Sequence, residues 1–238
     1  MINFEKIDWN VSGSIKILVT KKNFSSKKDF NISFSGKNKY EETRNNIDFL
    51  MDNFLPSKPY FIKQAHGKKV IDLDKNFFKS CVADGLVTRK RKQVISILTA
   101  DCMPIVISSI CGSIICVLHV GRKGAEFNII ESAFKILKNY NYSFEAWIGP
   151  CISKNYYIVD ENIKKKFISI DKKYEEFFFE NNKDLHMDLS GIATYQLKEN
   201  NVDNIYYSGL CTVKDCKDFY SFRKFSDEKR FGTFVWIE

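Results

Sequence analysis

Histidine and proline are scarce in this sequence of 238 residues, which has three histidines, four prolines and seven cysteines without a C-x-x-C pair. An odd number of cysteines at these spacings argues against a disulfide framework, a zinc ribbon and a thioredoxin-like site. No stretch reaches the roughly 18 uninterrupted apolar residues of a membrane-spanning helix, and the longest apolar run, residues 113–120, has the length of a strand. The sequence therefore predicts reduced thiols and no membrane span.

The N-terminal residues also lack the features of a secretory signal. Such a signal has a basic region followed by an apolar region, and residues 1–8 read MINFEKID without either. Together with the unpaired cysteines, this predicts a location in the cytoplasm.

Positive charge exceeds negative charge, with 37 lysines and arginines against 29 acidic residues and a formal net charge of +8. Clustered basic residues would suggest a nucleic-acid partner, but here the lysines are scattered, and only Arg89–Lys92 forms a dense run. We interpret that run as a solvated turn between two strands. The charge therefore predicts no nucleic-acid partner and only a weak preference for anionic substrates.

The length and composition favour one globular domain. A chain of this size can bury a large core, and 44% of the residues are hydrophobic and 15% aromatic. No repeat, low-complexity segment or linker rich in proline, glycine or serine divides the sequence. We therefore expect a single domain over residues 1–238.

Hydrophobic periodicity predicts helices alternating with strands. The expected strands cover 14–20, 60–65, 94–99, 104–109, 113–120, 144–148 and 231–237. The expected helices cover 40–54, 124–140 and 188–200, with further helical stretches in 162–179. Continuous apolar runs indicate strands that are covered on both faces, so the pattern predicts an α/β layered structure with mixed sheets.

Three chemically active side chains stand where predicted strands end. His66 precedes Gly67, and His119 ends an apolar strand before a glycine-flanked basic loop. Cys102 lies at the junction of two strand-like runs. Since strand ends gather at the edge of a sheet, these three side chains are candidates for one site.

Two imidazoles and one thiolate are a ligand set that suits zinc, and copper has a high intrinsic affinity for the same donors. Three protein ligands leave one position for water, whose pKa the metal lowers, or for a substrate oxygen. The long spacings between His66, Cys102 and His119 match no short zinc motif. The residues alone therefore leave open a metal site or separate structural and catalytic roles.

A series of short motifs in a fixed order carries a family resemblance. The motifs are Gln-x-His-Gly at 64–67, Ala-Asp-Gly at 83–85 followed by Thr88, Thr-Ala-Asp-Cys-x-Pro at 99–104, His-x-Gly-x-x-Gly at 119–124, Ile-Gly-Pro-x-Ile at 148–152, Asp-Leu at 188–189, Cys-Thr at 211–212 and Phe-Tyr-Ser-Phe-Arg at 219–223. From about residue 60 to the C-terminus, the chain resembles the laccase-domain family, also called polyphenol oxidase, YfiH-like or peptidoglycan-editing factor. Residues 1–55 contribute little to the resemblance.

The resemblance implies a fold, a metal site and an activity. It implies a four-layer α/β/β/α sandwich of mixed sheets, with the metal ligands on His66, Cys102 and His119. It also implies a zinc-dependent purine nucleoside phosphorylase with adenosine deaminase activity. Its partners would be small molecules, namely phosphate and adenosine, inosine, guanosine or methylthioadenosine, and the chain would be a monomer or a weak homodimer.

Two basic motifs depart from the family pattern. Relatives commonly read His-Ala-Gly-Trp-Arg-Gly, whereas this chain has Arg122 and Lys123 in place of the Trp-Arg pair. They also read Ser-Tyr-Arg-Arg where this chain has Phe222, Arg223 and Lys224 after the serine. Lysine cannot reproduce the bidentate fork of arginine, so substrate preference is less constrained than the metal site.

Four further residues are candidates for the reaction. Asp101 is the candidate for proton transfer, with Asp84 as the alternative, and Arg223, ahead of Lys123, for stabilising phosphate as the glycosidic bond breaks. Asp84 and Lys123 are candidates for binding the substrate. Each aspartate has turn capping as its alternative, and each cation a surface salt bridge. The third histidine, His186, precedes a predicted helix and is left out of the site.

Other functions use the same residues differently. One is a metal-free hydrolase of peptidoglycan precursors, with Cys102 as nucleophile and a histidine as base. A phenol oxidase with a single copper and a non-catalytic binding protein are further alternatives. Multicopper oxidases hold several ions through many more imidazoles than three, so that chemistry is improbable here.

Overall fold

The computed structural model describes residues 14–25, 27, 29–34, 40–75, 82–226 and 228–238. Its strands are β1 Ile15–Val19, β2 Val70–Asp72, β3 Gly85–Thr88, β4 Ile95–Thr99, β5 Met103–Ser109, β6 Ile115–Val120, β7 Phe144–Ile148, β8 Phe178–Asn181, β9 Asp184–Met187, β10 Ile205–Tyr207 and β11 Phe231–Ile237. Its α-helices are α1 Tyr40–Asn53, α2 Arg122–Glu126, α3 Ile129–Leu137, α4 Glu161–Ile170, α5 Leu189–Lys198 and α6 Phe222–Phe225, and its 3-10 helices are η1 Lys154–Tyr156 and η2 Lys172–Phe177.

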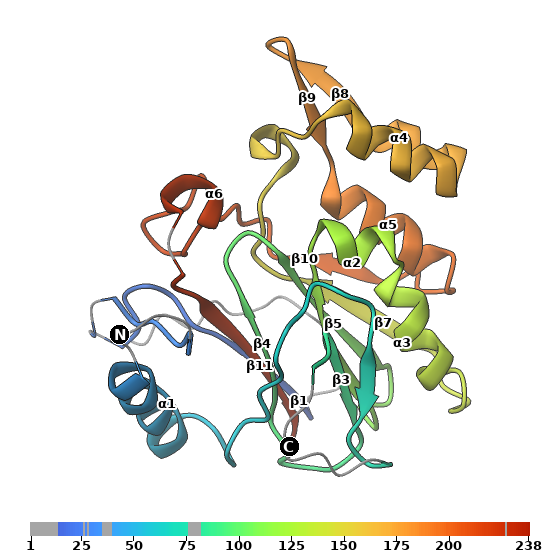
Figure 1. Cartoon of the computed structure of the whole chain (residues 1–238). Helices are drawn as coiled ribbons and strands as arrows, with labels where there is room; N and C mark the ends of the chain where they lie inside the picture. The colour runs from blue at the N-terminus through green and yellow to red at the C-terminus, as the bar shows by residue number, and fades with distance from the viewer. Residues whose placement is uncertain (1–13, 26, 28, 35–39, 76–81, 227) are drawn as a thin grey trace.

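The strands form two main sheets and a hairpin (Figure 1). The smaller main sheet has the order β1-β11-β4 and is antiparallel throughout. The larger sheet has the order β10-β7-β5-β6-β3-β2, with parallel pairs at both edges and antiparallel pairs between them. Strands β8 and β9 form the hairpin. The expectation of mixed sheets is confirmed.

Alternating side chains pack the two main sheets face to face. On β4, Ile95 and Ile97 join an inter-sheet core with Val106 and Val117 of the larger sheet. The opposite face of the smaller sheet packs on α1 (Figure 1), which contributes Leu50 to a second core. The outer face of the larger sheet is covered by α2, α3 and α5. The order of layers is α/β/β/α, as the resemblance implied.

One predicted helix is two helices. The segment expected as a single helix over 124–140 folds as α2 and α3, and the break falls at Asn128. Asn128 has a left-handed backbone with φ of 52°, and its side chain accepts a hydrogen bond from Glu131 N–H. Asparagine tolerates this conformation and caps helices well, so it ends one helix and starts the next.

The strand expected over 60–65 is also absent from the described structure, where Tyr60 and Lys63 form only isolated bridges. The side chain of Gln64 takes the place of a strand ladder. Its amide donates to the carbonyl of Leu98 at 2.8 Å and accepts the Leu98 N–H at 2.9 Å. This clamp holds the segment against β4 and leaves the chain free to turn at His66, whose φ is 57°.

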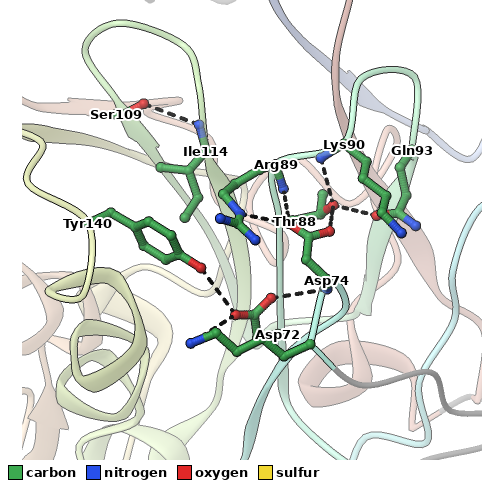
Figure 2. A network of polar contacts seen from close by, with 10 residues as sticks. Asp72, Asp74, Thr88, Arg89, Lys90, Gln93, Ser109, Ile114 and Tyr140 are labelled. Carbon is green, nitrogen blue, oxygen red and sulfur yellow. Dashed lines mark hydrogen bonds and ion pairs between the residues drawn. The ribbon is translucent and has the colours of Figure 1, made fainter.

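The basic turn predicted over Arg89–Lys92 connects β3 to β4 and is anchored by a polar network (Figure 2). Asp74, whose side chain is 6% exposed, accepts from the backbone N–H and from Nε of Arg89, both at 2.9 Å, and from Thr88 Oγ1 at 3.1 Å. The neighbouring Asp72 accepts from the Tyr140 hydroxyl at 3.4 Å. The network lies at the end of β3 opposite to Asp84.

The cysteines of the described residues are free thiols, in agreement with the prediction, while Cys81 lies outside those residues. Burial raises the pKa of Cys116 above the normal range, so this thiol stays protonated in the core. Among the described residues no helix is long and apolar enough to cross a membrane.

Candidate metal centre

Three side chains that are far apart in the chain meet at one edge of the sheets. His66, Cys102 and His119 each offer one ligand atom, and these atoms lie within 4.8 Å of one another. The two imidazole rings are 4.6 Å apart between centroids and meet edge to face. His66 follows the Gln64 clamp, Cys102 lies between β4 and β5, and His119 is the penultimate residue of β6. The structure therefore brings together the three residues that the sequence selected.

Asp84 holds this cluster together from behind. Its carboxylate accepts three successive backbone N–H groups, those of Ala65 at 3.2 Å, His66 at 2.9 Å and Gly67 at 2.7 Å. The same carboxylate lies 2.8 Å from Nδ1 of His119, and its side chain is 1% exposed. Asp84 thus fixes both the loop that carries His66 and the ring of His119.

The charge of Asp84 sets the tautomer of His119. Burial alone would raise the pKa of Asp84, but hydrogen bonds from His119 and from Gly67 N–H outweigh burial and lower it. An ionised carboxylate only accepts hydrogen bonds, so Nδ1 of His119 carries the proton. In the neutral ring the lone pair of Nε2 is then left for a ligand, the arrangement that carboxylates impose on metal-binding histidines.

Cys102 and His119 polarise each other. Burial would raise the pKa of the Cys102 thiol, but the charge of His119 and hydrogen bonds from both histidines lower it to about 6. Burial would lower the pKa of His119, but Cys102 and Asp84 raise it to about 9. In the absence of a metal ion, a thiolate beside an imidazolium is therefore the favoured state near neutral pH.

The backbone approaches the cluster closely at Gly121. A Cβ atom placed there would lie 2.9 Å from Cys102 Sγ and 3.2 Å from His66 Cδ2. The φ of Gly121 is −89°, which any residue adopts, so the glycine is required for space. A side chain at this position would displace two of the three ligand-bearing residues.

A cavity of about 1070 Å³ opens over the cluster. One part of its lining is apolar and is formed by Phe34, Phe61, Ile62, Leu98, Ile152, Leu189 and Phe222. Five cationic side chains line it as well, namely Lys63, Arg122, Lys123, Arg223 and Arg230. The only carboxylate that lines this cavity among the described residues is Asp101. The cavity is thus suited to a ligand with both an apolar part and an anionic part.

Asp101 joins the wall of the cavity to the β4–β5 turn. One carboxylate oxygen accepts from Thr212 Oγ1 at 2.6 Å, and the other accepts from the backbone N–H of Arg223 at 2.6 Å. The residue has a φ of 83° and is 9% exposed. Its carboxylate therefore anchors α6 beside Cys102 while lining the cavity.

The two cationic residues predicted for the site differ in how firmly their side chains are held. The guanidinium of Arg223 donates to the carbonyls of Tyr156 at 3.3 Å and Ile158 at 3.1 Å, and lies 5.2 Å from the ring centroid of Tyr157. Lys123 is exposed at the start of α2 and has no ion pair with any other described residue. Arg223 is thus fixed in the wall, whereas Lys123 is available to a ligand.

Two residues lie apart from the cavity lining. Asp84, predicted to bind the substrate, stands behind the candidate ligands and does not line the cavity. His186, left out by the sequence, is on β9, with Nδ1 2.9 Å from the Lys154 carbonyl oxygen and its ring stacked on Phe179.

Several residues that shape the site were not assigned a role from the sequence. Gln64, Gly121 and Thr212 all stand inside the motifs that carry the resemblance, so the motifs held a signal for them. Tyr157, which lines the cavity, stands outside those motifs. Nothing in its sequence context distinguishes it from the other tyrosines.

Comparison with known proteins agrees with this geometry. The family model described as multi-copper polyphenol oxidoreductase laccase matches residues 17–238. The purine nucleoside phosphorylase YfiH of Escherichia coli is 27% identical over 83% of this chain and 80% of its own length. The purine nucleoside phosphorylase of Haemophilus influenzae is 28% identical over 97% of this chain and 98% of its own. That of Xylella fastidiosa is 31% identical over 77% and 74%.

Solved structures share the fold at low sequence identity. The Neisseria meningitidis protein NMB0706 superposes with a TM-score of 0.87 at 21% identity, over 98% of each chain. YlmD from Geobacillus stearothermophilus superposes with a TM-score of 0.81 at 19% identity, over 95% of this chain and 93% of its own. The family model spans nearly the whole chain, and the fold and relatives agree with it. The chain therefore belongs to the multi-copper polyphenol oxidoreductase laccase family, whose relatives include the YfiH proteins.

Proposed function

We propose that this chain is a zinc-dependent purine nucleoside phosphorylase with adenosine deaminase activity, acting on adenosine, inosine, guanosine and methylthioadenosine. Relatives that match over most of their length carry the name purine nucleoside phosphorylase. The proposed location is the cytoplasm, and the proposed state is a monomer or a weak homodimer.

The observation that carries the proposal is the convergence of His66, Cys102 and His119 within 4.8 Å at the cavity. Two imidazole nitrogens and a thiolate fit zinc, and copper is a possible occupant of the same ligands. The lone pair that Asp84 leaves on His119 Nε2 and the space that Gly121 leaves beside Cys102 both favour an ion at this point. A metal held here would supply Lewis acidity to a substrate oxygen or a water molecule.

The lining of the cavity fits a purine nucleoside and phosphate. The apolar side chains offer flat surfaces to a purine, and Phe222 is 54% exposed at the rim. The cationic side chains compensate the charge of phosphate and of the bond that breaks. We assign the stabilisation of phosphate to Arg223 and further substrate binding to Lys123. Lys123 is the more adjustable of the two because it has no ion pair among the described residues.

The two aspartates have different proposed roles. Asp101 lines the cavity next to Cys102, and we retain it as the group that transfers protons in deamination. Its two hydrogen bonds, from Thr212 and Arg223, hold it in place for that task. For Asp84 we replace substrate binding by orientation of the metal ligands, because three backbone N–H groups and His119 surround its carboxylate.

A metal-free hydrolase is the second candidate, favoured by one specific observation. A thiol with a pKa of about 6 next to an imidazole is the usual state of a nucleophilic cysteine. Metal analysis of protein purified without a histidine tag separates the two functions. About one zinc per chain supports the metalloenzyme. Metal-free protein that loses activity when Cys102 is alkylated supports the hydrolase.

The activity itself is tested with adenosine, with and without phosphate. Metal-replete protein is incubated with the nucleoside, and adenine, inosine and hypoxanthine are separated by chromatography beside a Cys102→Ala control. Adenine that forms only with phosphate supports phosphorolysis, and inosine in both samples supports deamination. Turnover that is equal in Cys102→Ala, or absent for every named nucleoside, contradicts the proposal.

A further inference from the structure

Tyr157 is a cavity residue whose hydroxyl has no assigned role. It follows η1, and its ring packs against the core under the larger sheet while also lining the cavity. Its backbone is held in place, since the Tyr157 carbonyl accepts from Met187 N–H at 3.0 Å. Among the described residues the hydroxyl has no hydrogen-bond partner. A fixed, partly buried phenol therefore presents an unused donor to the cavity.

Two guanidinium groups line the cavity together with this phenol. Arg223 lies over the Tyr157 ring at 5.2 Å and is itself anchored on the carbonyls of Tyr156 and Ile158. Arg122 lines the same cavity from the start of α2, with its side chain 26% exposed. Its Nη1 donates to Glu126 at 2.9 Å, one helical turn further on. This ion pair fixes the direction of Arg122 and leaves its remaining N–H groups for a ligand.

We propose that Arg122, Tyr157 and Arg223 form the subsite that holds the phosphate, with Glu126 as the residue that positions Arg122. The inference rests on the proposed phosphorolysis and deepens it, because it assigns the phosphate to one part of the cavity. Arg122 is also a position at which this chain departs from the family pattern. The contribution of Arg122 to the subsite is therefore particular to this sequence.

The donors fit the chemistry of a phosphate ion. In phosphorolysis a phosphate oxygen forms a bond to the anomeric carbon while the carbon–nitrogen bond to the purine breaks. The electron pair of that bond leaves with the purine, which takes up a proton. Arginine forks bind phosphate oxygens in pairs, and a phenol O–H donates one further hydrogen bond.

The electrostatics of Tyr157 support donation. Burial and the nearby Cys102 raise the pKa of Tyr157 to about 12, while Arg122 and Arg223 act in the opposite direction. The hydroxyl therefore keeps its proton at neutral pH. Tyr157, the two arginines and the candidate metal ligands all line one cavity, where phosphate would stand beside the nucleoside.

The test uses the full chain with zinc, comparing Tyr157→Phe with Tyr142→Phe. Tyr142 is 42% exposed and does not line the cavity, so its variant matches the chemical change elsewhere. Binding of inorganic phosphate is measured by calorimetry. The Michaelis constants for phosphate and adenosine, and the rate of inosine formation without phosphate, are measured on the same samples. A second variant, Arg122→Lys, retains the charge and loses the fork.

Loss of a hydrogen bond to a charged ligand weakens binding by about tenfold or more. We expect that loss in phosphate affinity for Tyr157→Phe and Arg122→Lys, with inosine formation unchanged and Tyr142→Phe equal to the wild type. Unchanged phosphate binding in both variants would overturn the subsite, and so would a rise confined to the Michaelis constant of adenosine. If the wild type shows no phosphorolysis, the proposed function fails, and weaker phosphate binding by Tyr157→Phe still supports the subsite.

Discussion

Replacing Asp84 by asparagine tests how the proposed metal ligands are held. The change keeps the size of the side chain and removes its charge. Two effects should follow, because the carboxylate receives N–H groups from the His66 loop and from the His119 ring. The protein should become less stable, and the affinity for zinc should fall.

The size of the stability effect follows from the number of donors. Four N–H groups converge on the two oxygens of Asp84, whereas asparagine has one oxygen with two lone pairs and an amide that only donates. At least two of these donors, of which the three backbone N–H groups are partly buried, therefore lose their acceptor, at a cost of roughly 1–3 kcal/mol each. The free energy of unfolding should fall by roughly 2–6 kcal/mol, a large part of the usual total.

The effect on the metal follows from the tautomer of His119. An amide next to Nδ1 can donate a hydrogen bond to it, which moves the ring proton to Nε2 and blocks the ligand position. Loss of an orienting partner of this kind lowers metal affinity by about 10- to 100-fold. Urea denaturation measures the stability, and competition with a chromogenic zinc chelator measures the affinity.

Asp74→Asn is the matched control for Asp84→Asn. Asp74 is also a nearly buried carboxylate with three hydrogen bonds (Figure 2). It lies at the opposite end of β3, beside Thr88. We expect it to destabilise the fold and to leave zinc affinity unchanged. If Asp84→Asn binds zinc as tightly as Asp74→Asn does, the orientation of His119 by Asp84 is refuted.

Three further changes test the geometry around the cluster. Gly121→Ala should lower zinc affinity by about tenfold or more, because its Cβ would lie 2.9 Å from Cys102 Sγ. The control Gly124→Ala should leave zinc affinity unchanged, because its Cβ would meet its nearest atom at 3.4 Å. Competition with the zinc chelator compares the two variants. In metal-free protein, the rate at which iodoacetamide alkylates Cys102, measured by peptide mass, should fall to half its maximum as the pH drops to about 6. A midpoint of this rate near the ordinary thiol pKa of 9.0 would contradict the pairing of the Cys102 thiolate with His119. Gln64→Ala should lower the free energy of unfolding in urea by about 1–3 kcal/mol, because Leu98 loses two hydrogen bonds, and an unchanged midpoint would contradict the clamp.

The layers of the fold follow largely from sequence periodicity. The strand expected over 144–148 is β7, and the strand expected over 231–237 is β11, because these mostly apolar runs are buried along their whole length between two layers. Periodicity failed where a side chain replaced the backbone as hydrogen-bond partner. Asn128 caps a helix within a continuous apolar pattern, and Gln64 pairs with β4 in place of a strand. The face-to-face packing of the two sheets came from the resemblance alone.

The site could be predicted only in part, for a physical reason. Since the chain has only three histidines, His66 and His119 could each be examined alone, and the structure brings them next to Cys102. The role of a carboxylate depends instead on which donors surround it. Asp84 and Asp101 stand in similar motifs, yet one lies behind the ligands and the other lines the cavity. That difference arises from the tertiary structure.

The number of histidines also limits how many copper ions, the metal in the family's description, this chain can bind. All three histidines lie in the described structure, and His66 and His119 share one cluster, while His186 bonds the Lys154 carbonyl and stacks on Phe179. Among the described residues, one pair of imidazoles is therefore available, and it can bind one ion. A lone copper passes single electrons and cannot store those needed to reduce dioxygen to water. The proposed cleavage of a glycosidic bond and removal of an amino group involve no redox change, so a Lewis acid such as zinc on the same ligands would serve them.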